Sequence, residues 1–152
     1  MIQVNQNITI ERKPEEVFAY LADLTRLAEW QQGVVQTKVT TPGAVRLGTR
    51  FEETAKVGPW RLESKCEVTG FEPPRRMRFT ATGKQLAYDG EFALTPDGAG
   101  TRLEATAHVQ LRGFWRLMEP LMASDFKRET RQELQAIRGR LEGPMGEAPA
   151  TA

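Results

Sequence analysis

The sharpest candidate for chemistry in this sequence is a carboxyl group in a strand pattern. Between Phe51 and Val57, the alternation of a strand puts Glu53 on the same side as Phe51. A carboxyl group in apolar surroundings has a raised pKa, so Glu53 could serve as a general acid or base. The alternative, which the residues alone favour, is a bulged or edge strand in which Glu53 reaches solvent or a salt bridge.

Two hydroxyl groups share inward registers with apolar residues. Tyr88 alternates in step with Gly90 and Phe92, and its hydroxyl could orient a carbonyl or a phenol of a ligand. A buried tyrosine satisfied by backbone is the commoner case, and we favour it here. Ser64 could add a second hydroxyl, although a small inward serine more often only packs.

Other residue types that bind metals or attack substrates are scarce. His108 is the only histidine, and its neighbours Ala107 and Val109 hold the inward register, so we expect His108 on the solvent face. This excludes a Ser-His-Asp triad or a histidine metal cluster inside the protein. Cys66 is the only cysteine, and we expect an inert core thiol. With no Gly-rich phosphate loop, CxxC or HExxH, we expect no metal and no cofactor.

Strands and two short helices must position these residues. Residues 2–10 alternate as a strand does, and Pro14 followed by two glutamates is typical of a helix start. A second short helix would end near Trp30, which we expect to close the core. Turn signals divide residues 34–111 into about six strands, and the short connections make neighbours antiparallel.

A long helix must cover the buried face of this sheet. Between Phe114 and Leu141, apolar residues recur at three- and four-residue steps. Pro120 should mark a kink or the true start of this helix. The last ten residues, 143–152, have no apolar stripe and are predicted to be a mobile tail, which leaves residues 1–142 as one domain.

Composition limits the partners that we expect. The 152 residues carry 21 basic and 20 acidic side chains, a net charge of +1, so the basic excess typical of nucleic-acid binders is missing. The alternating first ten residues lack the apolar stretch of a signal peptide, and no apolar run is long enough to span a bilayer. We therefore expect a cytoplasmic protein without stable membrane insertion. The oligomeric state stays open.

The order of elements resembles the helix-grip fold of the START and Bet v-like superfamily (SRPBCC), and most closely its bacterial polyketide cyclase/dehydrase and lipid-transport branch. The opening strand, proline-acid helix start and tryptophan-ended second helix are read in residues 8–30, ITIERKPEEVFAYLADLTRLAEW. Residues 47–82 and 92–111 are similar to the family's hairpins, and the final helix begins with RLMEPLM. The resemblance implies an α+β fold, with a curved antiparallel sheet of about seven strands around the long C-terminal helix.

Small residues on the inward face of a curved sheet leave space, and large ones wall it. Each such residue alone is more often core than ligand contact, but the resemblance favours a cavity for the set. The residues that we expect to line it are Phe51, Glu53, Trp60, Leu62, Ser64, Cys66, Met77, Phe79, Tyr88, Phe92, Ala105, Ala107, Phe114, Met118, Met122 and Phe126.

Three functions follow from these patterns. The first is binding or transport of a small hydrophobic molecule such as a lipid, a quinone, a polyketide or another aromatic. The second is a polyketide cyclase or dehydratase in which Glu53 and Tyr88 form the acid-base pair. The third, which we rank last, is partner binding through the outer sheet face or the helix. Whether the protein is an enzyme stays open at this point.

Overall fold

The computed structural model describes residues 1–31, 33–57 and 60–143, with all side chains of this part except those of Val57 and Trp60. The strands are β1 (Ile2–Ile10), β2 (Val34–Val39), β3 (Arg50–Val57), β4 (Trp60–Glu72), β5 (Arg76–Gly83), β6 (Leu86–Asp97) and β7 (Gly100–Leu111). The helices are α1 (Pro14–Ala22), η1 (Leu24–Arg26), α2 (Leu27–Trp30), η2 (Gly113–Met118) and α3 (Glu119–Glu142). The tail predicted at residues 143–152 lies, apart from Gly143, outside the described residues.

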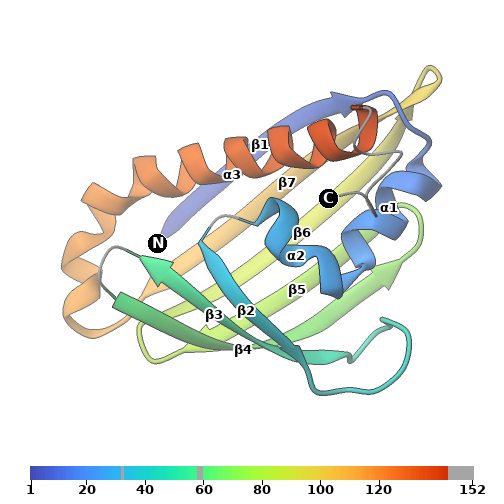
Figure 1. The fold of residues 1–152 in the computed structure, drawn as a ribbon. Coiled ribbons are helices and arrows are strands. Elements are labelled where there is room, and N and C mark those ends of the chain that lie inside the picture. Colours follow the sequence, from blue (N-terminus) through green and yellow to red (C-terminus); the bar gives the residue numbers. More distant parts are fainter. Residues whose placement is uncertain (32, 58–59, 144–152) are drawn as a thin grey trace.

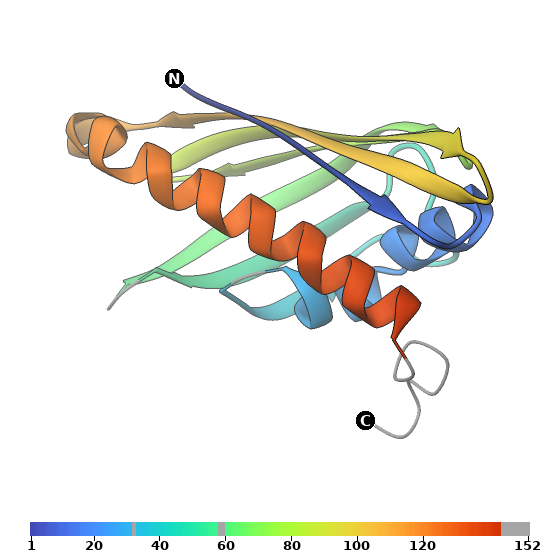
Figure 2. The ribbon, with the colours of Figure 1, turned by 90° about the horizontal axis from the view of Figure 1, so that it is seen from above.

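The strands form one antiparallel sheet in the order β1-β7-β6-β5-β4-β3-β2. The sheet curves strongly, and α3 runs along its concave side (Figures 1 and 2). The short helices α1 and α2 cover the same side near the C-terminal end of α3 (Figure 1). This is the predicted helix-grip fold, with its long C-terminal helix and its two short helices after the first strand. Within the described part of the chain, no helix is long and apolar enough to span a membrane.

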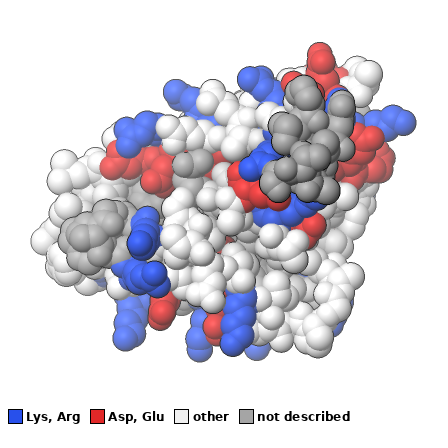
Figure 3. Space-filling view, viewed as in Figure 1, with Lys and Arg blue, Asp and Glu red and all other residues white. Residues whose placement is uncertain are grey.

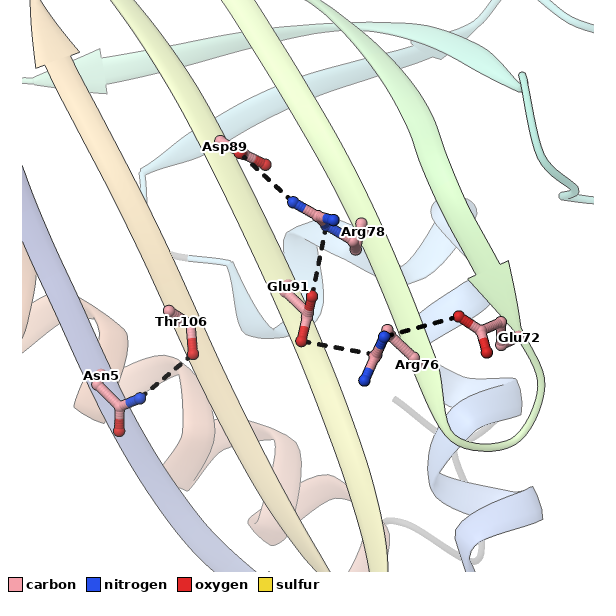
Figure 4. A network of polar contacts seen from close by, with 7 residues as sticks. All are labelled: Asn5, Glu72, Arg76, Arg78, Asp89, Glu91 and Thr106. Carbon is pink, nitrogen blue, oxygen red and sulfur yellow. Dashed lines mark hydrogen bonds and ion pairs between the residues drawn. The ribbon is translucent and has the colours of Figure 1, made fainter.

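The outer face of the sheet is polar, as the alternation predicts. Arg76 lies 3.7 Å from Glu91 on the next strand, and Arg78 lies 3.4 Å from Glu91 and 3.7 Å from Asp89 (Figure 4). These pairs are solvent-exposed, and such pairs contribute about 0–1 kcal/mol each. His108 lies exposed on this side as well. The face therefore keeps its charges in water, and the sheet buries its other side.

The long helix begins where proline allows it to begin. Met118 is the N-cap of α3 and Pro120 stands in its first turn, where the missing backbone N–H breaks no helical hydrogen bond. The predicted true start at Pro120 is thus confirmed. Leu134 and Ile137 are the buried residues of α3, with 2% and 0% of their surface exposed. The C-terminal half of the helix is therefore the half that anchors it to the sheet.

The core is divided into two clusters. One joins α1, α2 and the C-terminal half of α3 to the middle of the sheet, and it includes Trp30, whose ring meets Phe92 edge-on at 5.7 Å. The predicted place of Trp30 in the core is confirmed. The other cluster joins β1 and β7 to the N-terminal half of α3 through residues such as Val109, Met122 and Phe126. A cavity lies where these clusters meet.

Candidate functional site

A cavity of about 210 Å³ lies between α3 and the concave face of the sheet, bordered by residues of both core clusters. Side chains of a straight helix and a curved sheet diverge here and leave the space unfilled. The described residues that line the cavity are Gln31, Gly33, Val34, Glu53, Ala55, Lys56, Leu62, Ser64, Phe79, Ala81, Gln85, Leu86, Tyr88, Leu111, Trp115, Met122, Asp125, Phe126, Glu129, Thr130 and Glu133.

Glu53 points into the cavity. Its strand β3 lies between β2 and β4, and Glu53 pairs with Thr37 on one side and with Ser64 on the other. The edge or bulge that the sequence favoured is therefore wrong at this residue, because the β2 bulge lies between Val34 and Gln36 instead. Burial raises the pKa of Glu53 to about 7, although hydrogen bonds from Cys66 and Gln31 favour the charged form.

Tyr88 lies in the opposite wall, on β6, and glycine makes room for it. A Cβ atom at Gly90 would lie 2.6 Å from Cε1 of Tyr88 and 2.9 Å from its hydroxyl, so only glycine lets the ring lie flat here. Phe79 stacks on the ring with centroids 5.7 Å apart. Burial and the nearby carboxylates of Glu133 and Glu53 raise the pKa of Tyr88 above its ordinary value. The phenol therefore stays protonated and can donate a hydrogen bond.

Cys66 is next to the site but is not among the residues that line the cavity. Its Sγ lies 3.9 Å from Oε1 of Glu53, and burial together with that carboxylate raises the pKa of the thiol. A thiol in this state is a poor nucleophile. The inert thiol predicted from the sequence agrees with this environment. Among the described residues, no group of three side chains with metal-binding atoms lies close enough to hold an ion.

The predicted cavity residues fall into five groups. Those in the wall of the main cavity are Glu53, Leu62, Ser64, Phe79, Tyr88, Met122 and Phe126. Those around two narrow inner voids of about 30 and 10 Å³ are Phe51, Met77, Phe92, Ala105 and Ala107. Cys66 is in the adjoining core, and the side chain of Trp60 lies outside the described part of the chain.

The remaining two residues, Phe114 and Met118, were predicted to line the cavity, and they do not lie in its wall. Both are exposed, at 68% and 37%, because the residues before α3 form the 3₁₀ helix η2 rather than a further turn of α3. Gly113 opens η2 with a φ of +62°, and three residues per turn send Trp115 inward instead. The single apolar stripe predicted from Phe114 to Leu141 therefore breaks at the proline.

Sequence reasoning missed the polar residues that α3 and the α2–β2 connection contribute to the wall. On α3, Glu129, Thr130 and Glu133 continue the cavity-facing row of Met122 and Phe126. Their three- and four-residue spacing from Met122 and Phe126 places them on the same face of the helix. A search restricted to apolar residues does not detect them. Gln31 and Gly33 come from the connection between α2 and β2, which carries no pattern that would place them.

The polar atoms of the cavity are mostly acceptors. Glu53, Asp125, Glu129 and Glu133 bring four carboxyl groups, and among the described lining residues Lys56 is the only cation. Burial and the neighbouring Asp125 raise the pKa of Glu129. In addition, Oε1 of Gln31 is buried and accepts no hydrogen bond from the described part of the protein. Such a site favours a guest that donates hydrogen bonds and disfavours an anion.

A surface hollow adjoins the cavity at the end of the sheet. The first pair between β4 and β5 joins Ser64 to Gly83, so the end of the β3–β4 hairpin extends past the β5–β6 turn. The hollow, of about 770 Å³, lies at this end and shares Glu53, Ser64 and Gln85 with the cavity. Its wall also carries four cations, Arg61, Lys65, Lys84 and Arg112. The same wall carries the acids Glu52, Glu53 and Glu63, so charges of both signs lie beside the cavity.

Residues 1–142 match the family described as polyketide cyclase / dehydrase and lipid transport. The chain belongs to this family. A comparison with curated protein sequences gave no match.

Solved structures confirm the fold of this family member. The structure of TTHA0849 from Thermus thermophilus has a TM-score of 0.79 at 22% identity and covers 91% of this chain and 96% of that one. A START superfamily protein from Mycobacterium smegmatis has a TM-score of 0.77 at 13% identity, with 93% and 98% covered. The Zhui aromatase/cyclase from Streptomyces sp. R1128 has a TM-score of 0.74 at 16% identity, with 92% and 93% covered.

Proposed function

We propose that this protein binds, and carries in the cytoplasm, a small hydrophobic molecule that donates a hydrogen bond. The observation that carries the proposal is the cavity of about 210 Å³ between α3 and the sheet, apolar in most of its wall. Burial of apolar ligand surface would drive binding by roughly 25 cal/mol per Å², less the ordering costs. Membership of a family that includes lipid transport supports the same function.

The size of the cavity favours a compact guest. Pockets for drug-sized ligands measure about 300–1,000 Å³, and this cavity is smaller, at about 210 Å³. Aromatic walls from Phe79, Tyr88 and Phe126 suit one or two flat rings. We therefore prefer an aromatic or a short polyketide to a lipid with two long chains.

The polarity of the cavity selects the functional group. The buried Oε1 of Gln31 accepts no hydrogen bond from the described residues, and a buried acceptor left without a donor costs about 1–3 kcal/mol. A ligand hydroxyl or amine would satisfy it. A ligand carboxylate would instead face carboxyl groups of its own sign, since Lys56 at the exposed edge is the only described cation of the wall.

A matched set of probes tests both parts of this proposal. We expect calorimetric titration to show binding of 2-naphthol, weaker binding of naphthalene, and binding of 2-naphthoate at least about tenfold weaker than 2-naphthol, or roughly 1.4 kcal/mol. If 2-naphthoate binds as tightly as 2-naphthol, the expected polarity is wrong while hydrophobic binding stands. If all three fail to bind, the binding function itself is contradicted.

A second function, dehydration or cyclisation of a polyketide-like substrate, is supported by one further observation. Glu53, with a pKa of about 7, and the protonated Tyr88 line the same cavity. The carboxylate of Glu53 would take a proton from the carbon next to a substrate carbonyl, whose oxygen would accept a hydrogen bond from Tyr88. The electrons of that C–H bond would form the C=C bond, and the β-hydroxyl would leave as water with a proton returned by Glu53.

Dehydration of 4-hydroxy-4-phenyl-2-butanone to its conjugated enone, followed by ultraviolet absorbance, tests this function. We expect the Glu53→Gln variant to lose about 10²–10⁴-fold of any acceleration, which is the usual contribution of a general acid or base. Equal rates for the wild-type protein and for buffer would leave binding as the function.

A further inference from the structure

An apolar patch is exposed at the end of the molecule where η2 and α3 begin. Phe114, Leu117 and Leu121 are 68%, 79% and 68% exposed, and Met118 and Met1 add to them. The N-terminal ammonium of Met1 lies 2.7 Å from Oε1 of Glu119, which brings the first residue to the same place. We call these five residues the end patch. Single exposed apolar residues are ordinary, but a contiguous patch of large ones marks an interaction surface.

Positive charge borders the end patch. Arg112 and Arg116 flank Phe114 along the chain, and both are exposed. The backbone N–H of Arg112 donates to the carbonyl of Gln85 at 2.8 Å, so Lys84 on the β5–β6 turn belongs to the same end. Figure 3 shows uncharged side chains at this end, at the left of the view, with Lys and Arg as well as Asp and Glu side chains beside them.

The acids of this region are already engaged. Asp125, one helical turn after Leu121, lies 2.7 Å from Arg128, and Glu119 stands at the start of α3. Glu119 accepts hydrogen bonds from the N-terminal ammonium at 2.7 Å and from the backbone N–H of Leu111 at 3.1 Å, and both partners hold its pKa below the ordinary value. Its negative charge is therefore balanced by a cation in contact with it. An apolar surface bordered by cations fits the interface of a bilayer that contains anionic lipids, where apolar side chains enter the acyl boundary and cations meet phosphates.

The end patch is also next to the cavity. Within η2, Trp115 lines the cavity while its neighbours Phe114 and Leu117 point out to solvent. Arg112 lies in the wall of the hollow that adjoins the cavity. A bilayer in contact with the end patch would thus lie close to that hollow.

We propose that the end patch, with Arg112, Arg116 and Lys84, docks this protein on the surface of an anionic lipid bilayer. Docking there would bring the cavity, which Trp115 of the same 3₁₀ helix lines, close to the phase in which hydrophobic molecules dissolve, a consequence that rests on the proposed binding function. The docking itself does not depend on that function. A second copy of the chain or an acidic protein is the competing occupant of the end patch.

Sedimentation with vesicles tests the docking. We expect the full-length protein to bind vesicles of phosphatidylcholine and phosphatidylglycerol, and to bind vesicles of pure phosphatidylcholine at least tenfold more weakly. The triple variant Phe114→Ser, Leu117→Ser, Leu121→Ser should lose at least tenfold in partitioning to the anionic vesicles. The variant Arg112→Gln, Arg116→Gln should lose only the preference for anionic lipid, and it keeps the test open if the triple variant fails to fold.

A matched control removes three exposed apolar side chains elsewhere, by Val35→Ser, Val39→Ser and Leu47→Ser, which lie on β2 and in the following connection. This variant should bind vesicles as the wild type does. The proposal is overturned if the wild-type protein ignores anionic vesicles, or if the end-patch and control variants bind alike. It is also overturned if light scattering shows a dimer that the end-patch variant abolishes, since a second copy would then occupy the patch.

Discussion

At the scale of single residues, Glu53 decides most about the chemistry of the cavity. It is the only carboxyl group that β3 turns inward, and its pKa of about 7 means that small changes in pH change its charge. Whether it accepts or donates a hydrogen bond to a guest therefore depends on pH near neutrality. The raised pKa of Glu53 also affects the stability of the fold.

Replacement of Glu53 by glutamine should remove a pH dependence of stability. The carboxyl has an ordinary pKa of 4.5 and a folded-state pKa of about 7, so the folded protein holds the proton more tightly than the unfolded chain. Below pH 4.5 both states are protonated and the group costs nothing. As pH rises from about 4.5 to above 7, the wild type loses up to about 3 kcal/mol of unfolding free energy.

Urea unfolding at a series of pH values measures this effect. The stability of Glu53→Gln relative to the wild type should rise between about pH 4.5 and pH 7 and level off above pH 7. A difference between the two proteins that stays constant across this range would show that Glu53 is not buried as described.

Single residues also show what a sequence can and cannot predict. Solvent exposure of His108 and burial of Cys66 and Trp30 followed from alternation and from residue type, since one strand face is wet and the other is dry. The orientation of Glu53 did not follow, because alternation gives two faces but does not say whether a strand is interior or at an edge. Only the pairing of β3 with both β2 and β4 settles that question.

At the scale of elements, α3 has two halves with different roles. Its C-terminal half carries the fully buried Ile137 and Leu134, whereas its N-terminal half presents Met122, Phe126 and then acids to the cavity. A periodicity analysis treats both halves as one apolar stripe. The break at Gly113 and Pro120 explains why Phe114 and Met118 left that stripe, since a 3₁₀ turn does not preserve the angle of an α-helix.

Truncation of one residue in each half should separate these roles. Ile137→Ala should cost about 2–5 kcal/mol of unfolding free energy, because it opens a void in a filled core. Met122→Ala should cost less than about 1 kcal/mol, because its side chain already borders an empty space. Binding of 2-naphthol should weaken in Met122→Ala and persist in Ile137→Ala.

Chemical denaturation and calorimetry together check this pair. The division of α3 would be wrong if both variants lost the same stability, because the N-terminal half would then be filled core like the other.

At the scale of the whole molecule, the order of elements was sufficient for the fold. Short connections force neighbouring strands to be antiparallel, and the buried face of the sheet needs a helix to cover it. Few arrangements therefore fit the observed order of one strand, two short helices, six strands and a long helix. The hollow beside the cavity was not predictable in this way. It lies where β4 extends past its partner at Gly83, and strand lengths of that accuracy are not present in hydrophobic patterns.

The central claim is that the space between α3 and the sheet holds a ligand, and a substitution that fills it tests this most directly. Ser64 faces the cavity on β4, and Thr69 is an exposed hydroxyl residue of the same strand that does not line it. Phenylalanine at position 64 should fill much of the cavity, whereas phenylalanine at position 69 should project into solvent.

The measurement is calorimetric titration of 2-naphthol into the wild type, Ser64→Phe and Thr69→Phe, each first shown to unfold cooperatively. We expect Ser64→Phe to lose at least about tenfold in affinity, or roughly 1.4 kcal/mol, and Thr69→Phe to bind as the wild type does. Equal affinity of Ser64→Phe and the wild type would place the bound molecule elsewhere and contradict the account.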